Sequence, residues 1–283
     1  MELGEFGVWI TTRAIGGSAI DAQAAGEAAR LAEELGFAAL WIGGSPQLPP
    51  VRALLAGSER LPIATGVVNA WHAEPRTLAA ERAELAAAFP HRLLLGVGIN
   101  HPEGTAGWSR PVTRMSEYLD VLDAAPTPVP REERCLAALG PRMLALGAER
   151  TLGVHTYFVP VEHTRAAREQ LGPAPLIAVE LACVLDDKRE RARTVARGYA
   201  ERYLSLSNYT NNLRRFGWDD RAFADGGSDA LIDAVIAHGS PSTVVALARL
   251  HLAAGANHVC LQPLGSEDVP AEQWAALAGA LAA

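Results

Sequence analysis

The stretch Leu35-Gly36-Phe37-Ala38-Ala39-Leu40-Trp41-Ile42 decides the fold, because a helical segment ends at its glycine and a β-rich run follows at once. Glycine is the common residue just past the end of a helix, since it adopts the left-handed backbone freely. The same unit returns near the end of the chain, where Ala254-Gly255-Ala256 leads into Val259-Cys260-Leu261. Repetition of a helix followed by a buried strand is typical of a parallel sheet wrapped by helices.

Eight such β-rich runs alternate with stretches of helical period along the chain. Most are nearly continuous apolar runs, as expected of strands buried on both faces. They run from Phe6 to Ile10, Ala38 to Ile42, Ile63 to Val68, Leu93 to Val97, Cys135 to Ala138, Val154 to Phe158, Leu176 to Leu181, and His258 to Gln262. Eight units favour a (β/α)8 TIM barrel, and 283 residues is close to the roughly 250 of one barrel. We therefore predict one α/β domain over residues 1–283.

Two segments break the alternation. Pro126-Thr127-Pro128-Val129-Pro130 is a stiff, extended link into the fifth strand. Asp186 to Gly239 is too long for one connection, and it contains the polar and aromatic stretch from Tyr203 to Trp218, with Tyr209 at its centre. We predict an insertion of approximately residues 186–239 after the seventh strand, lying over the barrel mouth, where long loops usually carry function.

Composition narrows the class of partner. The 32 acidic and 25 basic residues give a net charge of −7, which offers no general attraction for nucleic acid or an anionic membrane. A small-molecule substrate is expected instead. Cys135, Cys183 and Cys260 lie far apart in apolar runs and predict buried, reduced thiols of a cytoplasmic protein. The acidic N-terminus and the lack of an apolar run of about 18 residues argue against secretion and membrane spanning.

The residues just past the predicted strands should form one mouth, because α/β barrels build their sites from the C-terminal strand ends. These positions are polar, small or aromatic. They include Thr11, Gly43, Gly44 and Ser45, Asn69, Ala70, Trp71 and His72, Gly98, Asn100 and His101, Gly140, Pro141 and Arg142, and Tyr157.

Gly140-Pro141-Arg142-Met143 forms the start of a helix that follows the fifth strand. Its free N–H groups and the positive end of the helix dipole are suited to an anion such as phosphate. An ordinary turn with proline at the first helical position explains the same residues.

Gly96-Val97-Gly98 resembles part of a dinucleotide fingerprint, but its sixth position is His101 and no acidic residue ends a second strand at the required distance. Gly98 either lets a flat ring approach the backbone, with Asn100 hydrogen-bonding that ring, or relieves crowding inside the barrel.

Several side chains are candidates for the chemistry. His72 and His101 follow strands and are either proton donors or loop histidines without a role. Glu180 lies within a strand, where an inward carboxylate is costly unless paired, and an ion pair inside the barrel is expected. Trp9, Trp41 and Trp71 form either an apolar wall for a ring or barrel packing. No spacing of His, Cys and Glu typical of a metal site occurs, so we expect no metal.

The strand ends together resemble the luciferase-like monooxygenase superfamily and, within it, the oxidoreductases that use coenzyme F420. The resemblance covers nearly the whole chain. The resemblance rests on four stretches of sequence: Leu35 to Gly44, Arg92 to Gly98, Ala137 to Met143 with Gly153 to Tyr157, and Gly239 to Pro241 running to Gly255 and Val259.

The resemblance implies a deazaflavin across the barrel mouth. Gly43, Gly44 and Ser45 would line its ring, and Asn69 and Ala70, where the family often has a bulged or cis peptide, would support its rear face. Gly98 and Asn100 would contact the ring or the ribityl chain. Gly140, Pro141, Arg142 and Met143 would hold the phosphate. Relatives are commonly homodimers, so a homodimer is expected.

Two departures from the family pattern affect the chemistry. Relatives often carry Asp or His after the second strand, where this chain has Gly43-Gly44-Ser45, and the link before the fifth strand is short. Substrate choice would then fall mainly to Tyr203 to Trp218, with Trp9, Thr11, Trp71 and Tyr209 as substrate contacts and His72, His101 and Tyr157 as candidate proton donors.

The leading hypothesis is hydride transfer between coenzyme F420 and a small organic substrate. An FMN-dependent monooxygenase and a non-catalytic barrel that binds a flavin are the alternatives.

Overall fold

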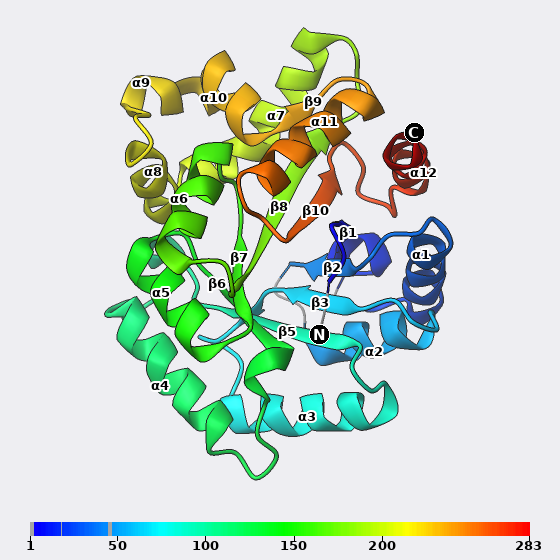
Figure 1. Ribbon diagram of the computed structural model, residues 1–283, viewed down its shortest axis with the longest axis vertical. Helices are drawn as coiled ribbons and strands as arrows, with labels where there is room; N and C mark the ends of the chain where they lie inside the picture. Colours follow the sequence, from blue (N-terminus) through cyan, green and yellow to red (C-terminus); the bar gives the residue numbers. More distant parts are fainter. Residues whose placement is uncertain (1–2, 18, 45–46) are drawn as a thin grey trace.

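Parallel strands close into a barrel that is surrounded by helices in the computed structural model, which describes residues 3–17, 19–44 and 47–283 (Figure 1). The barrel strands are β1 (Phe6–Thr11), β2 (Leu40–Gly43), β3 (Ile63–Gly66) continued by β4 (Val68–Asn69), β5 (Leu93–Gly98), β6 (Arg134–Ala137), β7 (Gly153–Thr156), β8 (Leu176–Val184) and β10 (His258–Pro263). Strand β10 pairs with both β1 and β8, which closes the sheet. All eight predicted strands are confirmed, and so is the TIM-barrel class.

The helices that wrap the barrel follow the strands in turn. They are α1 (Ala22–Glu34), α2 (Leu48–Ala56), α3 (Pro75–Ala88), α4 (Pro111–Asp123), α5 (Pro141–Arg150), α6 (Val161–Leu171), α7 (Arg189–Leu204), α11 (Pro241–Ala253) and α12 (Ala271–Ala282), with short 3-10 turns η1 (Thr12–Ile15), η2 (Pro102–Gly104) and η3 (Arg131–Glu133). The carboxylate of Asp21 accepts hydrogen bonds from the first free N–H groups of α1. Gly36, with φ of 81°, follows its last turn, as the sequence predicts.

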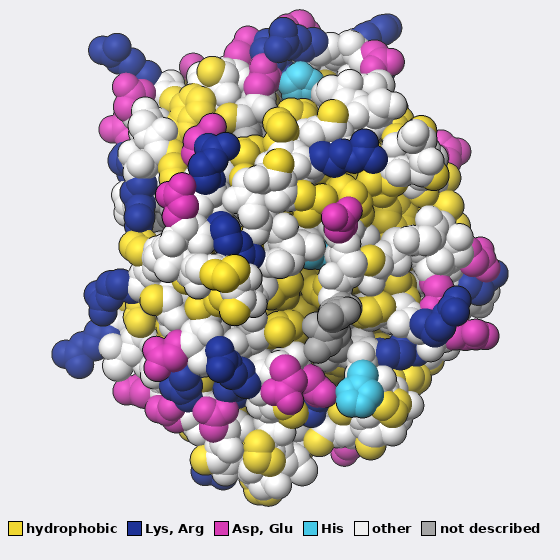
Figure 2. Space-filling view, viewed as in Figure 1, with side chains coloured by type: hydrophobic (Ala, Val, Ile, Leu, Met, Phe, Trp, Pro, Cys, Tyr) yellow, Lys and Arg dark blue, Asp and Glu magenta, His cyan; other side chains and the backbone are white. Residues whose placement is uncertain are grey.

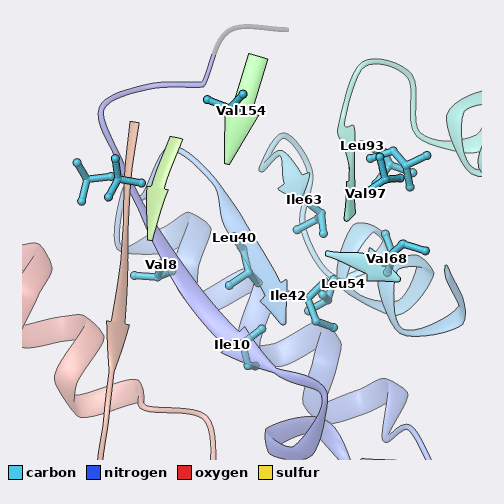
Figure 3. Packing of buried hydrophobic residues seen from close by; sticks show 14 of the residues in the cluster. Val8, Ile10, Leu40, Ile42, Leu54, Ile63, Val68, Leu93, Val97 and Val154 are labelled. Atoms are coloured by element: carbon cyan, nitrogen blue, oxygen red, sulfur yellow. The ribbon is translucent and has the colours of Figure 1, made fainter. Parts of the chain in front are cut away.

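Alternate residues of each strand point outward and pack against these helices. Figure 3 shows Val8 and Ile10 of β1 beside Leu40 and Ile42 of β2, with Leu54 of α2 close to Ile42. All five side chains are buried, and full burial of one such side chain stabilises the fold by about 1.5–3 kcal/mol. Figure 2 shows Lys, Arg, Asp and Glu interspersed over the outer helices, with hydrophobic side chains visible between them.

The other set of strand residues fills the barrel interior. Trp9 and Trp41 are register partners on β1 and β2. The Trp41 indole N–H donates to His258 Nε2 at 3.0 Å, and His258 Nδ1 lies 2.5 Å from the carbonyl oxygen of Gly4. Burial lowers the pKa of His258 to about 4, so this imidazole is neutral and donates from Nδ1 to Gly4. The three cysteines are buried and form no disulfide, as expected.

The predicted insertion after the seventh barrel strand is a small helical subassembly. It comprises α7, α8 (Ser207–Arg214), α9 (Asp220–Phe223), the 3-10 turn η4 (Ala224–Gly226), α10 (Asp229–Val235) and β9 (Ala237–His238), which pairs with β8. Arg193 of α7 bonds Asp229 and Asp233 of α10 at 2.5 and 2.6 Å, which ties the two helices together. Tyr209 and Leu213 of α8 pack in one apolar cluster with Phe158, which follows β7. In the part of the chain that the structure describes, no helix combines the length and apolarity needed to cross a bilayer.

Candidate active site

A cavity of about 710 Å³ opens at the C-terminal ends of the barrel strands. Its size lies within the roughly 300–1,000 Å³ of pockets that take small organic ligands. The residues that line it come from the C-terminal ends of β1 to β7 and of β10, from the loops after these strands, and from α7 and α8. The predicted mouth is therefore a real cavity, and the insertion forms one of its sides.

Small residues line one side of this cavity. Gly44, Gly66, Asn69 and Gly98 come from the ends of β2 to β5 and present backbone and little side chain. Because β2 and β7 are half a barrel apart in the strand order, this side lies across the mouth from the residues that follow β7. The arrangement leaves room for a flat group against the backbone.

Tyrosines gather on the other side. Four of the five tyrosines of the chain line the cavity: Tyr157, Tyr199, Tyr203 and Tyr209. Tyr157 follows β7, Tyr199 and Tyr203 belong to α7, and Tyr209 belongs to α8. This side therefore offers hydroxyl groups in an aromatic setting.

Trp9 forms the floor between the two sides. A Cβ atom on Gly43 or Gly66 would overlap the Trp9 indole, so both positions must be glycine for the indole to lie there. The indole stacks on His155 at 5.6 Å between ring centroids, and His155 stacks on Trp41 at 4.5 Å. Burial lowers the pKa of His155 to about 3, which keeps the floor uncharged.

The Tyr157 hydroxyl is the centre of a hydrogen-bonded network. It lies 2.6 Å from the hydroxyl of Tyr199 and 3.1 Å from that of Tyr203, and it donates to Gln262 Oε1 at 2.9 Å. Burial raises the pKa of Tyr157 and of Tyr199 well above 10, so both phenols keep their protons at neutral pH. The network thus places a neutral proton donor inside the cavity.

Glu180 of β8 lies beneath this network and is almost fully buried, with 2% of its surface exposed. The prediction that Glu180 forms an ion pair inside the barrel is wrong. Among the described residues, no Lys, Arg or His lies within salt-bridge distance of the Glu180 carboxylate. Its partners are the Tyr199 hydroxyl at 3.5 Å from Oε1 and the Phe158 backbone N–H at 3.4 Å from Oε2. Burial raises the pKa of Glu180 to about 8, so the group is a neutral acid.

His101 and Asn100 line the cavity beside the insertion. The His101 ring lies 5.5 Å from the Tyr209 ring, and burial lowers the pKa of His101. Glu103, in the same loop after β5, accepts a hydrogen bond of 2.8 Å from the backbone N–H of Ser207 at the start of α8. This loop and α8 together border the mouth.

Three predicted site residues lie elsewhere. Ala70, Trp71 and His72 line a second cavity, of about 450 Å³, between the loop after β4 and α4. There the Arg114 guanidinium stands 4.0 Å from the centre of the Trp71 ring. Residues 70 to 72 turn away from the first cavity, so the structure does not bring His72 and Trp71 to the tyrosine network.

The predicted phosphate residues are at the start of α5, with Gly140 as the N-cap and no side chain capping the helix. Met143 N–H donates to the Gly140 carbonyl at 3.0 Å, and Gln170 donates to the Pro141 carbonyl at 2.7 Å. No atom lies within 4 Å of the place where a Gly140 Cβ would stand. The four residues Gly140 to Met143 are not among those that line the first cavity, although this helix end is open.

The remaining predicted site residues lie at separate places in the structure. Thr11, Trp9 and Tyr209, the expected substrate contacts, line the cavity, while Gly43 lies against Trp9. The cis peptide that the resemblance placed at Asn69 and Ala70 stands earlier, at Gly66–Val67. Ser45 lies outside the described residues.

Sequence reasoning missed the contribution of α7. Val195, Gly198, Tyr199 and Arg202 line the cavity, and their spacing of three, four and seven residues is that of one helix face. This pattern is visible in the sequence, but an aromatic and a glycine on a helix carry no sign of what they face. Within the described residues, Arg202 has no carboxylate at salt-bridge distance.

A model of the luciferase-like monooxygenase family matches residues 3–258 of the chain. The chain belongs to the luciferase-like monooxygenase family. No curated protein matches the sequence.

Solved structures of several enzymes share the fold over almost the whole chain. An F420-dependent secondary alcohol dehydrogenase, in complex with an F420–acetone adduct, is 13% identical with a TM-score of 0.74, covering 99% of this chain and 98% of that one. The F420-dependent tetrahydromethanopterin reductase of Methanopyrus kandleri is 15% identical with a TM-score of 0.74 and the same coverage, 99% and 98%. The oxygenating constituent of 3,6-diketocamphane monooxygenase of Pseudomonas putida, in complex with FMN, is 17% identical with a TM-score of 0.66 over 96% and 95%. These similarities show the barrel fold.

Proposed function

We propose that this luciferase-like protein is an F420-dependent oxidoreductase that interconverts a small carbonyl compound and its alcohol. The observation that supports this proposal most strongly is the neutral Tyr157 hydroxyl. It lies in the cavity opposite the side that is lined by small residues and backbone. Reduction of a carbonyl needs a hydride at carbon and a proton at oxygen. Bound deazaflavin would supply the hydride, and Tyr157 would supply the proton.

The residues present fit a flat ring at the small-residue side of the cavity. Gly44, Asn69 and Gly98 would lie against the ring, and Asn100 would hydrogen-bond it. Space for the ring and a substrate is supported at Gly198, where a Cβ would meet no atom within 4 Å although the residue lies inside α7. Glycine inside a helix destabilises it by about 0.5–1 kcal/mol relative to alanine, so Gly198 keeps this space open at the expense of the stability of α7.

The phosphate end of the cofactor would lie at the start of α5. The open, uncapped helix end at Gly140 presents a positive dipole end, and a phosphate there would be favoured by the backbone N–H of Arg142.

Tyr157 would act on the substrate oxygen. Burial keeps the phenol protonated, and Tyr199 and Tyr203 hold its oxygen in place from α7. In the direction of carbonyl reduction, Tyr157 donates its proton to the developing alkoxide. In the direction of alcohol oxidation, Tyr157 receives the alcohol proton as its own proton passes to Tyr199. A general acid placed in this way contributes roughly 10²- to 10⁴-fold to the rate.

The proposal is tested with reduced F420 and a panel of small ketones and aldehydes under anaerobic conditions. We expect oxidation of the cofactor in step with formation of alcohol, and no dependence on oxygen. Oxygen uptake that requires reduced FMN, with no turnover of reduced F420, would favour the flavin-dependent monooxygenase instead. Tight binding of either cofactor without turnover of any compound would favour a non-catalytic barrel.

A further inference from the structure

Glu180 is a buried acid to which the proposed chemistry gives no role. Its side chain points into the barrel, where β8 pairs with β10 and Glu180 has Cys260 as its register partner. Its Oε1 atom faces the Tyr199 hydroxyl, and its Oε2 atom accepts the Phe158 N–H. Phe158 has φ of 54°, a conformation that is costly for a residue with a side chain.

The hydroxyl protons of the network have two arrangements. When Tyr157 directs its single proton to Gln262 Oε1, the proton in the short contact with Tyr199 belongs to Tyr199, and the proton of a neutral Glu180 then completes the contact between Glu180 Oε1 and Tyr199. When Tyr199 turns its proton away from Tyr157, it donates to Glu180 Oε1 at 3.5 Å or to Gln262 Oε1 at 3.4 Å. Oε2 of Glu180 accepts the Phe158 N–H in both arrangements.

We propose that Glu180 is the proton store of the site and that it reprotonates Tyr157 through Tyr199. This inference rests on the proposed function for the identity of the reaction, but not for the network itself. When Tyr157 gives its proton to the substrate oxygen, the Tyr199 proton moves to Tyr157 and the Glu180 proton moves to Tyr199. Glu180 is left as a carboxylate, and it regains a proton from water by the same path once the cavity is open.

The surroundings of Glu180 suit this role. The titratable groups around it are Tyr157 after β7, Tyr199 and Tyr203 of α7, Cys260 of β10, Tyr209 of α8 and, on the outer face of its own strand, Cys183, while the cation of Arg202 acts on Tyr203 and Tyr209. The phenols and thiols among them are neutral at physiological pH. Within the part of the chain that the structure describes, no charged group acts on Glu180 itself, so the acid holds its proton at rest and releases it when a phenol next to it has lost one, and burial raises its pKa to about 8.

Infrared spectroscopy of the protein without added cofactor tests the network directly. We expect the carbonyl band of a protonated carboxylic acid at neutral pH, lost with a midpoint near pH 8 and absent from Glu180→Gln. The band should shift in Tyr199→Phe, which removes the direct partner, and stay in place in Tyr118→Phe. Tyr118 is a matched control because it is also buried and lies outside the network. An unchanged band in Glu180→Gln, or no shift in Tyr199→Phe, would overturn the proposal.

Turnover supplies the second test. We expect the wild-type rate to decline above about pH 8, and we expect Glu180→Gln to bind cofactor like the wild type, to turn over about 10²-fold more slowly and to lack this decline. A residue with only a structural role would leave the pH profile unchanged, and that result would overturn the relay. If wild-type protein does not use F420 while the infrared bands behave as described, the proposed function fails and the proton store stands.

Discussion

The hydroxyl of Tyr157 lies 2.6 Å from the hydroxyl of Tyr199, which joins the end of β7 to the first helix of the insertion. The insertion therefore does more than cover the mouth, because α7 supplies a group that holds the proposed proton donor. The contact depends on Tyr199 being on the same face of α7 as Gly198 and Arg202, which also line the cavity.

Substitution of Tyr157 tests the proton donor. Tyr157→Phe keeps the ring and removes the hydroxyl, so we expect the rate of carbonyl reduction to fall by roughly 10²- to 10⁴-fold while cofactor affinity is retained. Steady-state kinetics and a cofactor titration on the same preparation measure the two effects. Tyr118→Phe removes a buried phenol outside the cavity and should match the wild type. Equal rates for Tyr157→Phe and wild type would exclude Tyr157 as the donor.

The phosphate site is tested by a pair of substitutions at Gly140. Asp and Asn cap a helix about equally well, and Gly140 has a backbone conformation open to both, with φ of −81°. Only Asp brings a negative charge to the proposed phosphate. We expect Gly140→Asp to bind cofactor at least about tenfold more weakly than Gly140→Asn, a difference of about 1.4 kcal/mol. Equal dissociation constants would place the phosphate elsewhere.

The open space at Gly198 permits two opposite effects at one position. Gly198→Ala should stabilise α7 by about 0.5–1 kcal/mol, because alanine has the higher helix propensity and its Cβ meets no atom within 4 Å. Gly198→Phe should fold as well but fill part of the cavity, and binding should weaken at least about tenfold. Thermal unfolding and ligand titration measure these outcomes. Unimpaired binding to Gly198→Phe would show that the ligand does not reach α7.

The buried acid should also make stability depend on pH. Glu180 has a pKa of about 8 in the fold against 4.5 for an ordinary glutamate, so between these values the unfolded chain has lost a proton that the folded chain keeps. The free energy of unfolding contributed by Glu180 therefore falls as pH rises through this window and is constant above about pH 8. Each pH unit within this window lowers the free energy of unfolding by about 1.4 kcal/mol.

Urea unfolding of the wild type and Glu180→Gln at about pH 5, 6.5 and 8 measures this dependence. Because glutamine does not titrate, we expect the stability of Glu180→Gln relative to the wild type to increase across the series. A constant difference at all three pH values would mean that Glu180 is already ionised in the fold.

The barrel could be predicted from the sequence because buried parallel strands have short, nearly continuous apolar sequences. Each run, such as Leu93 to Val97, is local and needs no knowledge of its partners. The mouth followed from the same reasoning, since strand C-terminal ends meet on one side of any such barrel. Thr11 and Asn100, which follow predicted strands, line the cavity, and so do Trp9 and Tyr157, which lie within predicted strands.

The partners of these residues could not be predicted in the same way. Gly43 and Gly66 are required by the indole of Trp9, a contact between strands that no local pattern indicates. The sequence predicts an ion pair for Glu180, but its partner Tyr199 belongs to a helix whose rotation about its axis is set by tertiary packing. His72 follows a strand as His101 does, yet its loop turns toward α4.

Titration of the purified protein with F420 and with FMN, followed by cofactor fluorescence, tests the central claim most directly. We predict saturable binding of F420 that is weakened in Gly140→Asp and in Gly198→Phe, with FMN binding more weakly than F420. Tight binding of FMN together with no binding of F420 would contradict the account.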